Sequence, residues 1–506
     1  MTHPWWRSAA FYQIYVRSFQ DSNGDGVGNL PGIRSRLPYL QELGVDALWL
    51  TPFYPSPQVD HGYDVADYTD VDPQFGTLDD FDALVADAHE LGIRVTIDIV
   101  PNHTSDQHEW FKNAIADPEH PDRARYMFRP GRNGGPPNGW TSAFGGPAWT
   151  LDPKTGDYYL HLFAPEQPDL DWHNEAVQES FEEILRFWLD RGVDGFRIDV
   201  AHLLFKAQDL PEMVEPVPPS NFGDWLSAVL QPELHPLYRR WRQVADEYPG
   251  ERMYVGEIVI ENQERIASFV EPDQLHLSFN FALLYEQWEA DRMRETIDRT
   301  LVALGAVGAT ATWVFENHDV TRLPTRYGGG EVGQRRARAA TLLLFSLPGT
   351  SFTYQGQELG LEEVDLPDEV RQDPIFFRTN GERLGRDGCR VPIPWTTTPP
   401  AFGFTGSEPW LPMPEDWGAV CVEAQEGNPA SMLALYRSAL RLRPRDDDFA
   451  WRASARGTIA FDRGDLTCLV NFDAPELELP EGELVIASEP DITTSLPPNT
   501  AAWVRT

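Results

Sequence analysis

The feature that most constrains the fold is a repeated alternation between short apolar runs and longer segments with helical periodicity. Amphipathic segments at 78–91, 177–189 and 335–347 are examples of the helical part. The runs that have the length and composition of buried strands span residues 11–16, 47–50, 94–100, 195–200, 253–259, 275–281, 312–315 and 351–354. This alternation predicts parallel strands joined by right-handed crossovers.

Eight such units in succession favour one closed barrel over an open, doubly wound sheet. A dinucleotide-binding sheet would place a Gly-x-Gly-x-x-Gly turn after its first strand, and none follows residues 11–16. At 506 residues the chain is also longer than a plain barrel. The sequence therefore predicts an α/β fold, a (β/α)8 barrel of the TIM type with added segments.

Two intervals break the alternation. About 70 residues rich in Pro, Gly, Trp and Asp separate the third strand from the helix before the fourth, and a loop of that length must fold on its own account. We expect an inserted subdomain over 103–172, at the carboxyl face of a barrel formed by 1–102 and 173–425. Beyond it, a helix at 431–441 leads into short alternating runs, which predict a small antiparallel β domain over 426–506.

The strongly negative charge limits the partners. At a formal net charge of -38 the chain would be repelled by nucleic acid and by an anionic membrane surface. A neutral substrate such as a small sugar meets no such repulsion. Whether the acidity also reflects adaptation to salt is left open.

Cysteine usage and hydropathy indicate a reducing compartment. Cys389, Cys421 and Cys468 are odd in number and widely spaced, so they predict neither a disulfide framework nor a zinc site. The first residues carry no apolar stretch behind a basic one, and no apolar run approaches the length of a membrane span. The expected location is cytoplasmic.

Four predicted strands end in polar residues. The third ends in Asp98-Ile-Val-Pro-Asn-His103, the fourth in Arg197-Ile-Asp199, the fifth in Gly256-Glu257, and the seventh in Asn317-His318-Asp319. One buried carboxylate of this kind is more often structural than catalytic. Because catalytic groups of a barrel gather at the carboxyl ends of its strands, four such ends together predict an active site.

The spacing and chemistry suit glycoside hydrolysis. Residues two apart face the same side of a strand, so Arg197 and Asp199 should both point into the barrel mouth, where the guanidinium orients the carboxylate and favours its ionised form. Asp199 and Glu257 supply the carboxylate pair that breaks a glycosidic bond. The alternative for Arg197 and Asp199 is a buried structural ion pair.

At these residues the chain resembles the α-amylase family, glycoside hydrolase family 13, and within it the oligo-1,6-glucosidase and α-glucosidase branch. The resemblance runs nearly end to end, from Phe11-Tyr-Gln-Ile-Tyr-Val-Arg-Ser-Phe19 to Ser431-Met-Leu-Ala-Leu-Tyr-Arg437. All four signature stretches of the family are present, and they are the four polar strand ends described above.

The resemblance implies a role for each site residue. Asp199 is the nucleophile, Glu257 the acid/base, and Asp319 the third acid, which binds sugar hydroxyls. The residues implied to line the subsite of the terminal glucose are Arg197, His103, His318, Tyr63, which stacks on the sugar, and Asp60, which pairs with Arg390. That last pair closes the subsite in exo-acting members, so the chain is expected to release single glucose units from short α-glucosides with retention.

The first loop has the residue pattern of a cation-binding loop. Asp21, Asn23, Asp25, Val27 and Asn29 place oxygens at alternate positions, with glycines between them for the turn. Family relatives hold a structural calcium or magnesium there, remote from the chemistry, and no cofactor is expected for catalysis. The usual last ligand is an aspartate, whereas Asn29 is neutral. The alternative is a loop held by its own Asx turns.

Linkage and reaction type stay open. Val200 accompanies α-1,6 cleavage in this branch, but Val200-Ala201-His202 matches neither standard pattern, and Arg322 is expected either near the acceptor side or in a surface ion pair. The covalent intermediate could also pass to a sugar or alcohol, which would make the enzyme a glucosyltransferase or a sucrose or trehalose isomerase. A non-catalytic protein with the same fold is the remaining alternative. It is disfavoured, because non-catalytic relatives lack the carboxylates that Asp199, Glu257 and Asp319 provide.

Overall fold

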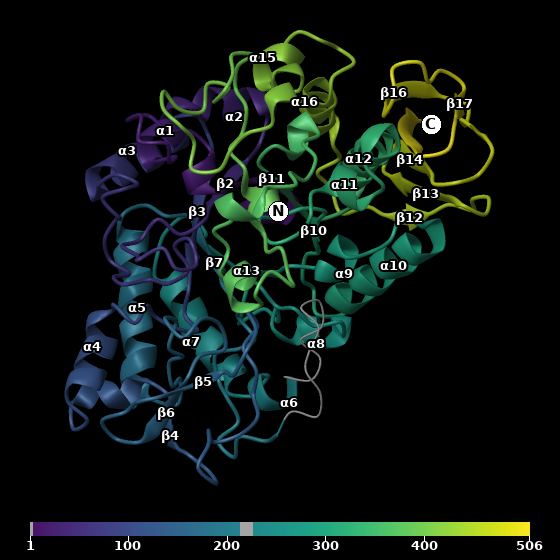
Figure 1. Ribbon diagram of the computed structural model, residues 1–506. Coiled ribbons are helices and arrows are strands. Elements are labelled where there is room, and N and C mark those ends of the chain that lie inside the picture. The colour runs from purple at the N-terminus through teal and green to yellow at the C-terminus, as the bar shows by residue number, and fades with distance from the viewer. Residues whose placement is uncertain (1–3, 213–225) are drawn as a thin grey trace.

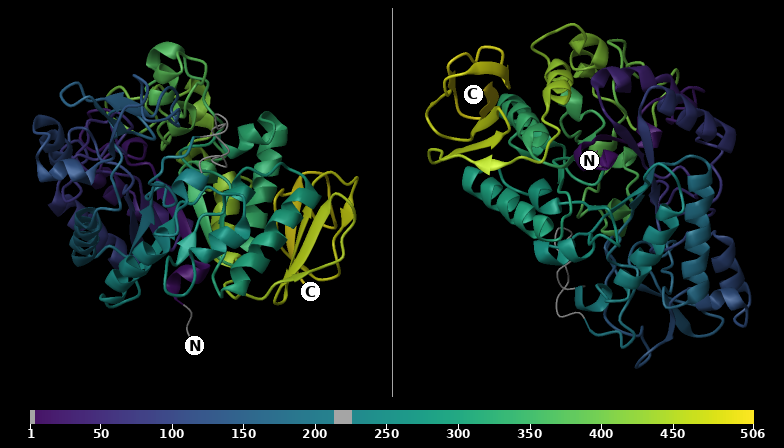
Figure 2. Two further views of the ribbon diagram at one scale, coloured as in Figure 1. Left: turned by 90° about the horizontal axis from the view of Figure 1, so that it is seen from below. Right: turned by 180° about the vertical axis from the view of Figure 1, so that it is seen from behind.

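The computed structural model describes residues 4–212 and 226–506 of the chain, so the first three residues of the amino-terminal segment lie outside it. A central barrel carries an inserted segment on one side and an antiparallel sheet at the carboxyl terminus on the opposite side (Figures 1 and 2). None of the helices in these two ranges is long and apolar enough to cross a membrane.

Parallel strands form the barrel and follow the order β10-β11-β1-β2-β3-β7-β8-β9. The two end strands of this order are linked by a hydrogen bond from the Thr312 hydroxyl to the Ser278 carbonyl. The bounds are β1 (Ala10–Ile14), β2 (Ala47–Leu50), β3 (Arg94–Ile99), β7 (Gly195–Ile198), β8 (Met253–Gly256), β9 (Leu277–Ser278), β10 (Thr312–Val314) and β11 (Thr350–Tyr354). The predicted barrel is confirmed, and each of its strands falls within or next to its predicted range.

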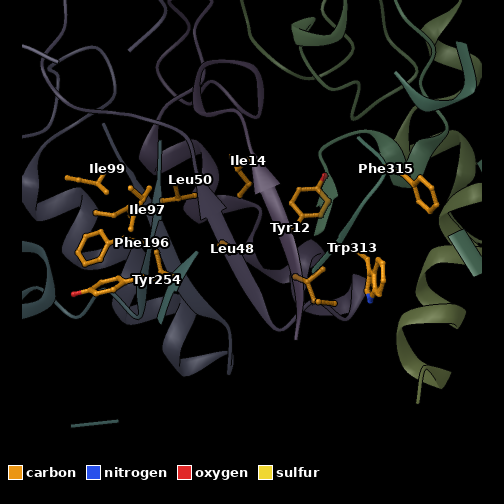
Figure 3. Packing of buried hydrophobic residues seen from close by; sticks show 14 of the residues in the cluster. Tyr12, Ile14, Leu48, Leu50, Ile97, Ile99, Phe196, Tyr254, Trp313 and Phe315 are labelled. Atoms are coloured by element: carbon orange, nitrogen blue, oxygen red, sulfur yellow. The ribbon is translucent and has the colours of Figure 1, made fainter. Parts of the chain in front are cut away.

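Side chains alternate between the inside and the outside of the barrel. The inward set includes Phe11, Trp49 and Phe352, which pack in one cluster; the Phe11 and Phe352 rings stack at 4.6 Å between centroids. The outward set packs against the helices and includes Tyr12, Leu48, Ile97 and Phe196 (Figure 3). Because the strands are buried on both faces, they appear in the sequence as continuous apolar runs.

The surrounding helices start where the sequence supplies caps. Thr77 and Asp80 form a capping box at the start of α3 (Leu78–Glu90), and Asn174 caps α5 (Glu175–Asp190). The remaining long helices are α7 (Leu234–Asp246), α10 (Ala290–Ala306) and α12 (Gly330–Ser346). The predicted segments 78–91, 177–189 and 335–347 correspond to α3, α5 and α12, with α12 starting five residues earlier than predicted.

The inserted segment contains α4 (Glu109–Ala116) and a small antiparallel sheet with the order β4 (Phe128–Pro130), β6 (Asp157–Leu160), β5 (Trp149–Leu151). It follows β3 and therefore starts at the carboxyl end of the barrel. Short bridges, such as that between His103 and Asp169, hold its two ends together. This places its side chains beside the strand ends that carry the predicted catalytic residues.

The carboxyl-terminal region starts with α16 (Met432–Leu442) and continues into an antiparallel sheet with the order β12 (Ala450–Trp451), β13 (Thr458–Arg463), β14 (Leu466–Asn471), β18 (Thr500–Arg505), β16 (Glu483–Ala487). The Trp503 indole donates to the Leu342 carbonyl of α12 at 3.1 Å. The sheet packs against the outer helices, away from the inserted segment (Figure 2). The predicted antiparallel sheet is confirmed.

Candidate active site

A cavity of about 480 Å³ opens at the carboxyl ends of the barrel strands. Its walls come from the strand ends, from the inserted segment and from the loop that follows α13 (Pro374–Arg378). Of the nine residues predicted for catalysis and substrate binding, those that line it are Asp60, Tyr63, His103, Asp199, Glu257, His318 and Asp319. Arg197 and Arg390 do not line the cavity but contact residues that do.

Strand register explains why the carboxylates converge. Asp98 of β3 lies beside Arg197 of β7, and Arg197 lies beside Val255 of β8. Asp199 and Glu257 directly follow the last residues of β7 and β8, two positions beyond Arg197 and Val255, so they face the same way as those residues. The chain turns sharply after Asp199, where Val200 has a φ of 36°. The site is thus built from the last inward positions of three neighbouring strands.

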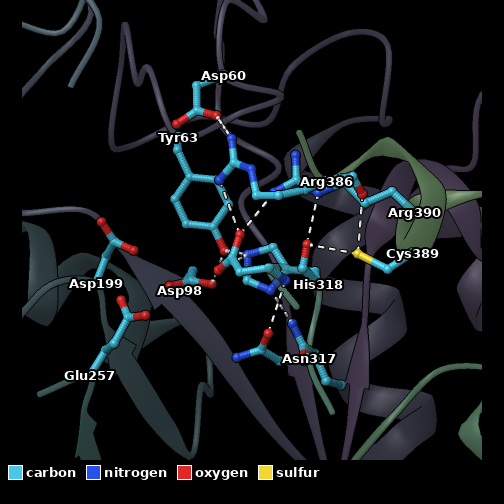
Figure 4. Close-up of polar contacts among 12 residues, drawn as sticks. Asp60, Tyr63, Asp98, Asp199, Glu257, Asn317, His318, Arg386, Cys389 and Arg390 are labelled. Carbon is cyan, nitrogen blue, oxygen red and sulfur yellow. Dashed lines mark hydrogen bonds and ion pairs between the residues drawn. The ribbon is translucent and has the colours of Figure 1, made fainter. Parts of the chain in front are cut away.

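A single guanidinium holds these carboxylates. Arg197 Nη1 lies 2.8 Å from Asp98 Oδ1 and 2.6 Å from Asp199 Oδ1, and its Nη2 lies 2.6 Å from Glu257 Oε2. The backbone N–H of Val200 also donates to Glu257 Oε2 at 3.0 Å. Asp199 and Glu257 therefore stand side by side, as Figure 4 shows.

Burial raises the pKa of Asp199 well above its ordinary value, and the negative charges of Glu257, Asp98 and Asp319 act in the same direction. Arg197 lowers it, as predicted from the sequence, but does not outweigh these effects. Burial likewise raises the pKa of Asp98 to about 6. One cation, Arg197, faces three carboxylates, so the cluster favours binding one proton. One carboxyl group can then be protonated and act as the acid while another is ionised and acts as the nucleophile.

Asp319 has the opposite electrostatics. Burial acts to raise its pKa, but the charge of His318, which is protonated only at acid pH, and the charges of Arg386, Arg390 and Arg197 hold it well below the usual range. Arg386 Nη1 and Arg390 Nη2 lie 3.0 Å and 2.9 Å from Asp319 Oδ1. Asp319 therefore carries a fixed negative charge at neutral pH.

His318 and Tyr63 form a neutral pair beside the acids. Their rings stack at 5.4 Å between centroids with an angle of 7° between planes, and the Tyr63 hydroxyl lies 2.7 Å from His318 Nε2. Burial holds the pKa of His318 well below its ordinary value and lowers that of His103 to about 4. Both imidazoles are therefore uncharged at neutral pH. Each neutral ring has one nitrogen that donates a hydrogen bond and one that accepts a hydrogen bond.

One predicted pairing is wrong. Asp60 was expected to pair with Arg390, but Asp60 Oδ1 lies 2.7 Å from Arg386 Nη2 instead. Arg386 also contacts Asp319, and its Nε lies 2.6 Å from Asp373 Oδ2. Arg386 starts the short helix α14 (Asp387–Arg390) and Arg390 ends it, one turn later. Both guanidinium groups therefore reach Asp319, but only Arg386 reaches across to Asp60.

The sequence reasoning missed three contributors. Arg386 lies four residues before Arg390 but received no role from the sequence. Asp98 was named only as part of a strand end, and Gln167 was not singled out within the inserted segment. The Gln167 amide donates to Asp60 Oδ2 at 3.2 Å. Asp98 and Arg197 lie opposite each other on the adjacent strands β3 and β7. Of the contacts made by these three residues, theirs is the one that strand pairing could have indicated.

Arg322 and Cys389 lie behind the cavity wall. Arg322 was expected near the acceptor side or in a surface ion pair, but it is buried and pairs with the buried Glu316 at 2.8 Å. It also donates to the Cys389 carbonyl at 2.8 Å, which anchors the helix that bears Arg390. The Cys389 thiol is buried, and burial raises its pKa well above the ordinary value.

The predicted cation loop is held by its own hydrogen bonds. Asp21 Oδ1 accepts from the N–H groups of Asn23 and Gly24, and its Oδ2 accepts from the Gly26 N–H and the Thr405 hydroxyl. These donors fill the lone-pair positions of that carboxylate. Asp25 Oδ1 accepts from the Val27 N–H at 2.9 Å.

Asn29 is also committed elsewhere. Its Oδ1 caps α1 (Leu30–Ser35) by accepting from the Gly32 N–H, and it accepts from the Ser22 hydroxyl as well, both at 2.8 Å. These hydrogen bonds are those of a loop held by Asx turns, and the calcium or magnesium stays a prediction.

Comparisons with known proteins agree with the site. A model of the alpha-amylase catalytic domain matches residues 13–451. A probable alpha-glucosidase of Rhizobium meliloti strain 1021 is 41% identical over 476 residues, which covers 90% of this chain and 85% of the relative. An oligo-1,6-glucosidase of Parageobacillus thermoglucosidasius is 35% identical over 483 residues, covering 88% and 85%.

Among solved structures, an alpha-glucosyl transfer enzyme superposes with a TM-score of 0.90 at 38% identity, and all of both chains is covered. The family model spans both the barrel and the inserted segment, and it includes all four signature stretches. The chain therefore belongs to the α-amylase family of glycoside hydrolases, as its four polar strand ends indicated.

Proposed function

We propose that this protein is an exo-acting, retaining α-glucosidase that releases glucose from the non-reducing end of short α-glucosides. The observation that carries the proposal is the ion-paired end of the cavity. Asp60 and Arg386 join two loops that are far apart in the sequence across one end of the cavity, and Arg386 also holds Asp319. A chain that continued past this end would have to break these contacts, whereas a single terminal sugar fits in front of them.

In the first step, an Asp199 oxygen forms a bond to the anomeric carbon while the bond from that carbon to the leaving oxygen breaks. Glu257 gives its proton to the leaving oxygen, so the leaving group departs as a neutral alcohol. The shared guanidinium supports this assignment, because Arg197 holds Asp199 and Glu257 close enough to flank one anomeric carbon, with Asp199 on the face opposite the leaving oxygen.

In the second step, water attacks the same carbon and the bond to Asp199 breaks. Glu257, now ionised, takes a proton from the water, so both carboxyl groups return to their starting states. Two inversions at one carbon give net retention. Asp319 stays ionised throughout, and its charge stabilises the positive character of the sugar ring in both transition states.

The remaining polar groups of the cavity bind hydroxyls. The cavity presents the uncharged imidazoles of His103 and His318 and the carboxylates of Asp60 and Asp319. These groups can form hydrogen bonds with the hydroxyls of a sugar, which both donate and accept. The Tyr63 ring supplies an apolar surface at the same end.

Following the anomeric form of the first glucose by proton NMR during hydrolysis of an aryl α-glucoside tests the proposal. Retention predicts that α-glucose appears first and then mutarotates. If β-glucose appears first, the double-displacement mechanism is wrong. If internal bonds of a long maltodextrin are cut before glucose appears, the exo-acting assignment is wrong.

Glucosyl transfer is the second candidate, and the similarity to the solved glucosyl transfer enzyme favours it. The two functions share the first step and differ only in what attacks the intermediate. Product analysis at high substrate concentration separates them: transfer products in excess of free glucose support the transferase, and sucrose or trehalose isomers support an isomerase. A panel of maltose and isomaltose measures the α-1,4 and α-1,6 preference.

The proposal also includes the domain boundaries and the cellular location of the protein. The insertion of a sheet between β3 and α5 and the antiparallel sheet after α16 support a barrel over 1–102 and 173–425, an inserted subdomain over 103–172 and a terminal β domain over 426–506. Three buried cysteines without disulfides suit a cytoplasmic location.

A further inference from the structure

Three carboxylates contact the guanidinium of Arg386, and only two of them line the cavity. Asp60 Oδ1 lies 2.7 Å from its Nη2 and Asp319 Oδ1 lies 3.0 Å from its Nη1, as Figure 4 shows for the Asp60 contact. The third carboxylate, Asp373, is fully buried and is not part of the cavity lining. Its contacts with Arg386 are therefore made behind the cavity wall, out of reach of a substrate.

Asp373 holds the inner edge of this guanidinium. Its Oδ2 accepts from Arg386 Nε at 2.6 Å and from the Arg386 backbone N–H at 2.7 Å, and its Oδ1 lies 3.4 Å from Arg386 Nη2. A guanidinium is planar, so fixing one edge also fixes the directions of its other N–H groups. With Nε bound to Asp373, the two Nη atoms point to Asp319 and Asp60.

A second carboxylate bonds in the reverse direction. Asp387 Oδ2 accepts from the backbone N–H groups of Gln372 at 2.7 Å and of Asp373 at 2.9 Å. Residues 372–373 and 386–387 thus each give a carboxylate to the backbone of the other. Both carboxylates are buried, where a carboxylate is tolerated only when it is well paired. This reciprocal set of bonds fixes the start of α14 against the start of α13.

The position before Arg386 has to be a glycine. Gly385 has a φ of 77°, and a Cβ atom there would lie 2.6 Å from the Cβ of Asp373. Any side chain at 385 would therefore strain the backbone and push Asp373 away from Arg386.

Asp373 has two roles that a test must separate. Burial acts to raise its pKa, but Arg386 and Arg390 hold it below the ordinary range, so the carboxylate is ionised at neutral pH and its bonds with Arg386 are charge-assisted. Asp373 also caps α13, since its Oδ1 accepts from the Ile375 N–H at 2.8 Å.

We propose that Asp373 is a positioning residue: it holds Arg386 in the orientation that contacts both Asp60 and Asp319, and so sets how tightly the ion-paired end binds a terminal glucose. This inference rests on the proposed α-glucosidase function and deepens it. It also explains why Arg386 and not Arg390 meets Asp60, because Asp373 is bonded to both the backbone and the side chain of Arg386.

The first test is Asp373→Asn. Asparagine is an equally good N-cap, but with one oxygen in place of two it cannot serve both the Ile375 N–H and Arg386. We expect kcat/KM to fall about tenfold for maltose and for 4-nitrophenyl α-glucoside alike, mainly through KM, and the inhibition constant of free glucose to rise by a similar factor. Asp365→Asn is the matched control, because the Asp365 side chain is 97% exposed, and it should change neither value by more than about twofold.

A double-mutant cycle with Arg386→Lys separates positioning from a merely structural role. Lysine has no Nε–H for Asp373, so in that background Asp373→Asn should change kcat/KM by less than about twofold. A second tenfold loss would show that Asp373 acts independently of Arg386 and would overturn the proposal. An unchanged inhibition constant for glucose in folded Asp373→Asn would overturn it as well.

Gly385→Ala displaces Asp373 without changing its charge, and it serves in place of Asp373→Asn if the Tm of that variant falls below the assay temperature. The same rise in the inhibition constant of glucose is expected, and a wild-type value in the folded variant contradicts the proposal. Anomeric retention and covalent labelling of Asp199 do not depend on Asp373, so they test the α-glucosidase function separately.

Discussion

The ion-paired end of the cavity and the group of carboxylates around Arg197 differ in how they are built. At the first, every charged group has a fixed partner: Arg386 contacts Asp60, Asp319 and Asp373, and Arg390 contacts Asp319. At the second, the single guanidinium of Arg197 contacts three carboxylates, those of Asp98, Asp199 and Glu257. Paired, fixed charges in a buried site discriminate strongly between substrates, whereas an excess of carboxylates over cations favours holding a proton. The ion-paired end should thus select the glucosyl group, and the group around Arg197 should carry out the transfer.

The largest effect is expected from Asp199→Asn, which removes the nucleophile of the group around Arg197. We expect kcat to fall by about 10⁴-fold or more for every substrate, because an amide cannot form the glycosyl ester. Initial rates on maltose and on 4-nitrophenyl α-glucoside measure this. Residual activity that differed strongly between the two substrates would show that chemistry and leaving-group binding are not separable in this way.

Arg386→Lys breaks the ion-paired end alone. Lysine keeps the charge but cannot contact Asp60, Asp319 and Asp373 together, so kcat/KM should fall by about 10²-fold. Because these contacts belong to the side that binds the glucosyl group, the same factor is expected for neutral aryl glucosides and for maltose. A loss confined to one class would show that Arg386 also acts on the leaving group.

The next effect in size is expected on the acid limb of the pH profile of kcat/KM. Attack requires ionised Asp199, so kcat/KM falls as the pH drops through its pKa. Since burial and the neighbouring carboxylates raise that pKa, the limb should lie above about pH 4, the ordinary value for aspartate. Removing one negative charge with Asp98→Asn should move the limb to lower pH, and by the same amount for all leaving groups.

No shift, or a shift to higher pH, would contradict the assigned cause. The thermal unfolding midpoint of Asp98→Asn, measured at each pH, controls for loss of folded protein.

The smallest effect is expected from cations. The 21–29 loop belongs to neither of these two regions, and its Asp21 oxygens already accept four hydrogen bonds. Removing divalent ions with EDTA, or adding millimolar calcium, should shift Tm by less than about 1 °C and leave both substrates unaffected. A rise of several degrees with calcium would show that the predicted cation site is real.

The barrel and the catalytic carboxylates could be predicted because their signals are local. Strands buried on both faces give unbroken apolar runs, and Asp199, Glu257 and Asp319 stand where those runs end. Two residues of separation on one strand were enough to place Arg197 beside Asp199, at the observed 2.6 Å.

The contacts between loops could not be predicted in the same way. Asp60 and Arg386 are 326 positions apart, on segments without periodicity, and Arg390 carries the same charge four residues later. One helical turn between the two arginines lets both reach Asp319, so sequence spacing does not decide which one meets Asp60. The burial of Arg322 against Glu316 depends likewise on how the loops pack.

The central claim is that Asp199 forms a covalent bond to the glucosyl group during turnover. A 5-fluoro-α-glucosyl fluoride, whose intermediate breaks down slowly, allows the adduct to be measured by mass spectrometry of the intact protein and of its peptides. The account predicts one added glucosyl group, located on Asp199 and absent from Asp199→Asn. Label on another residue, or turnover without any adduct, would contradict it.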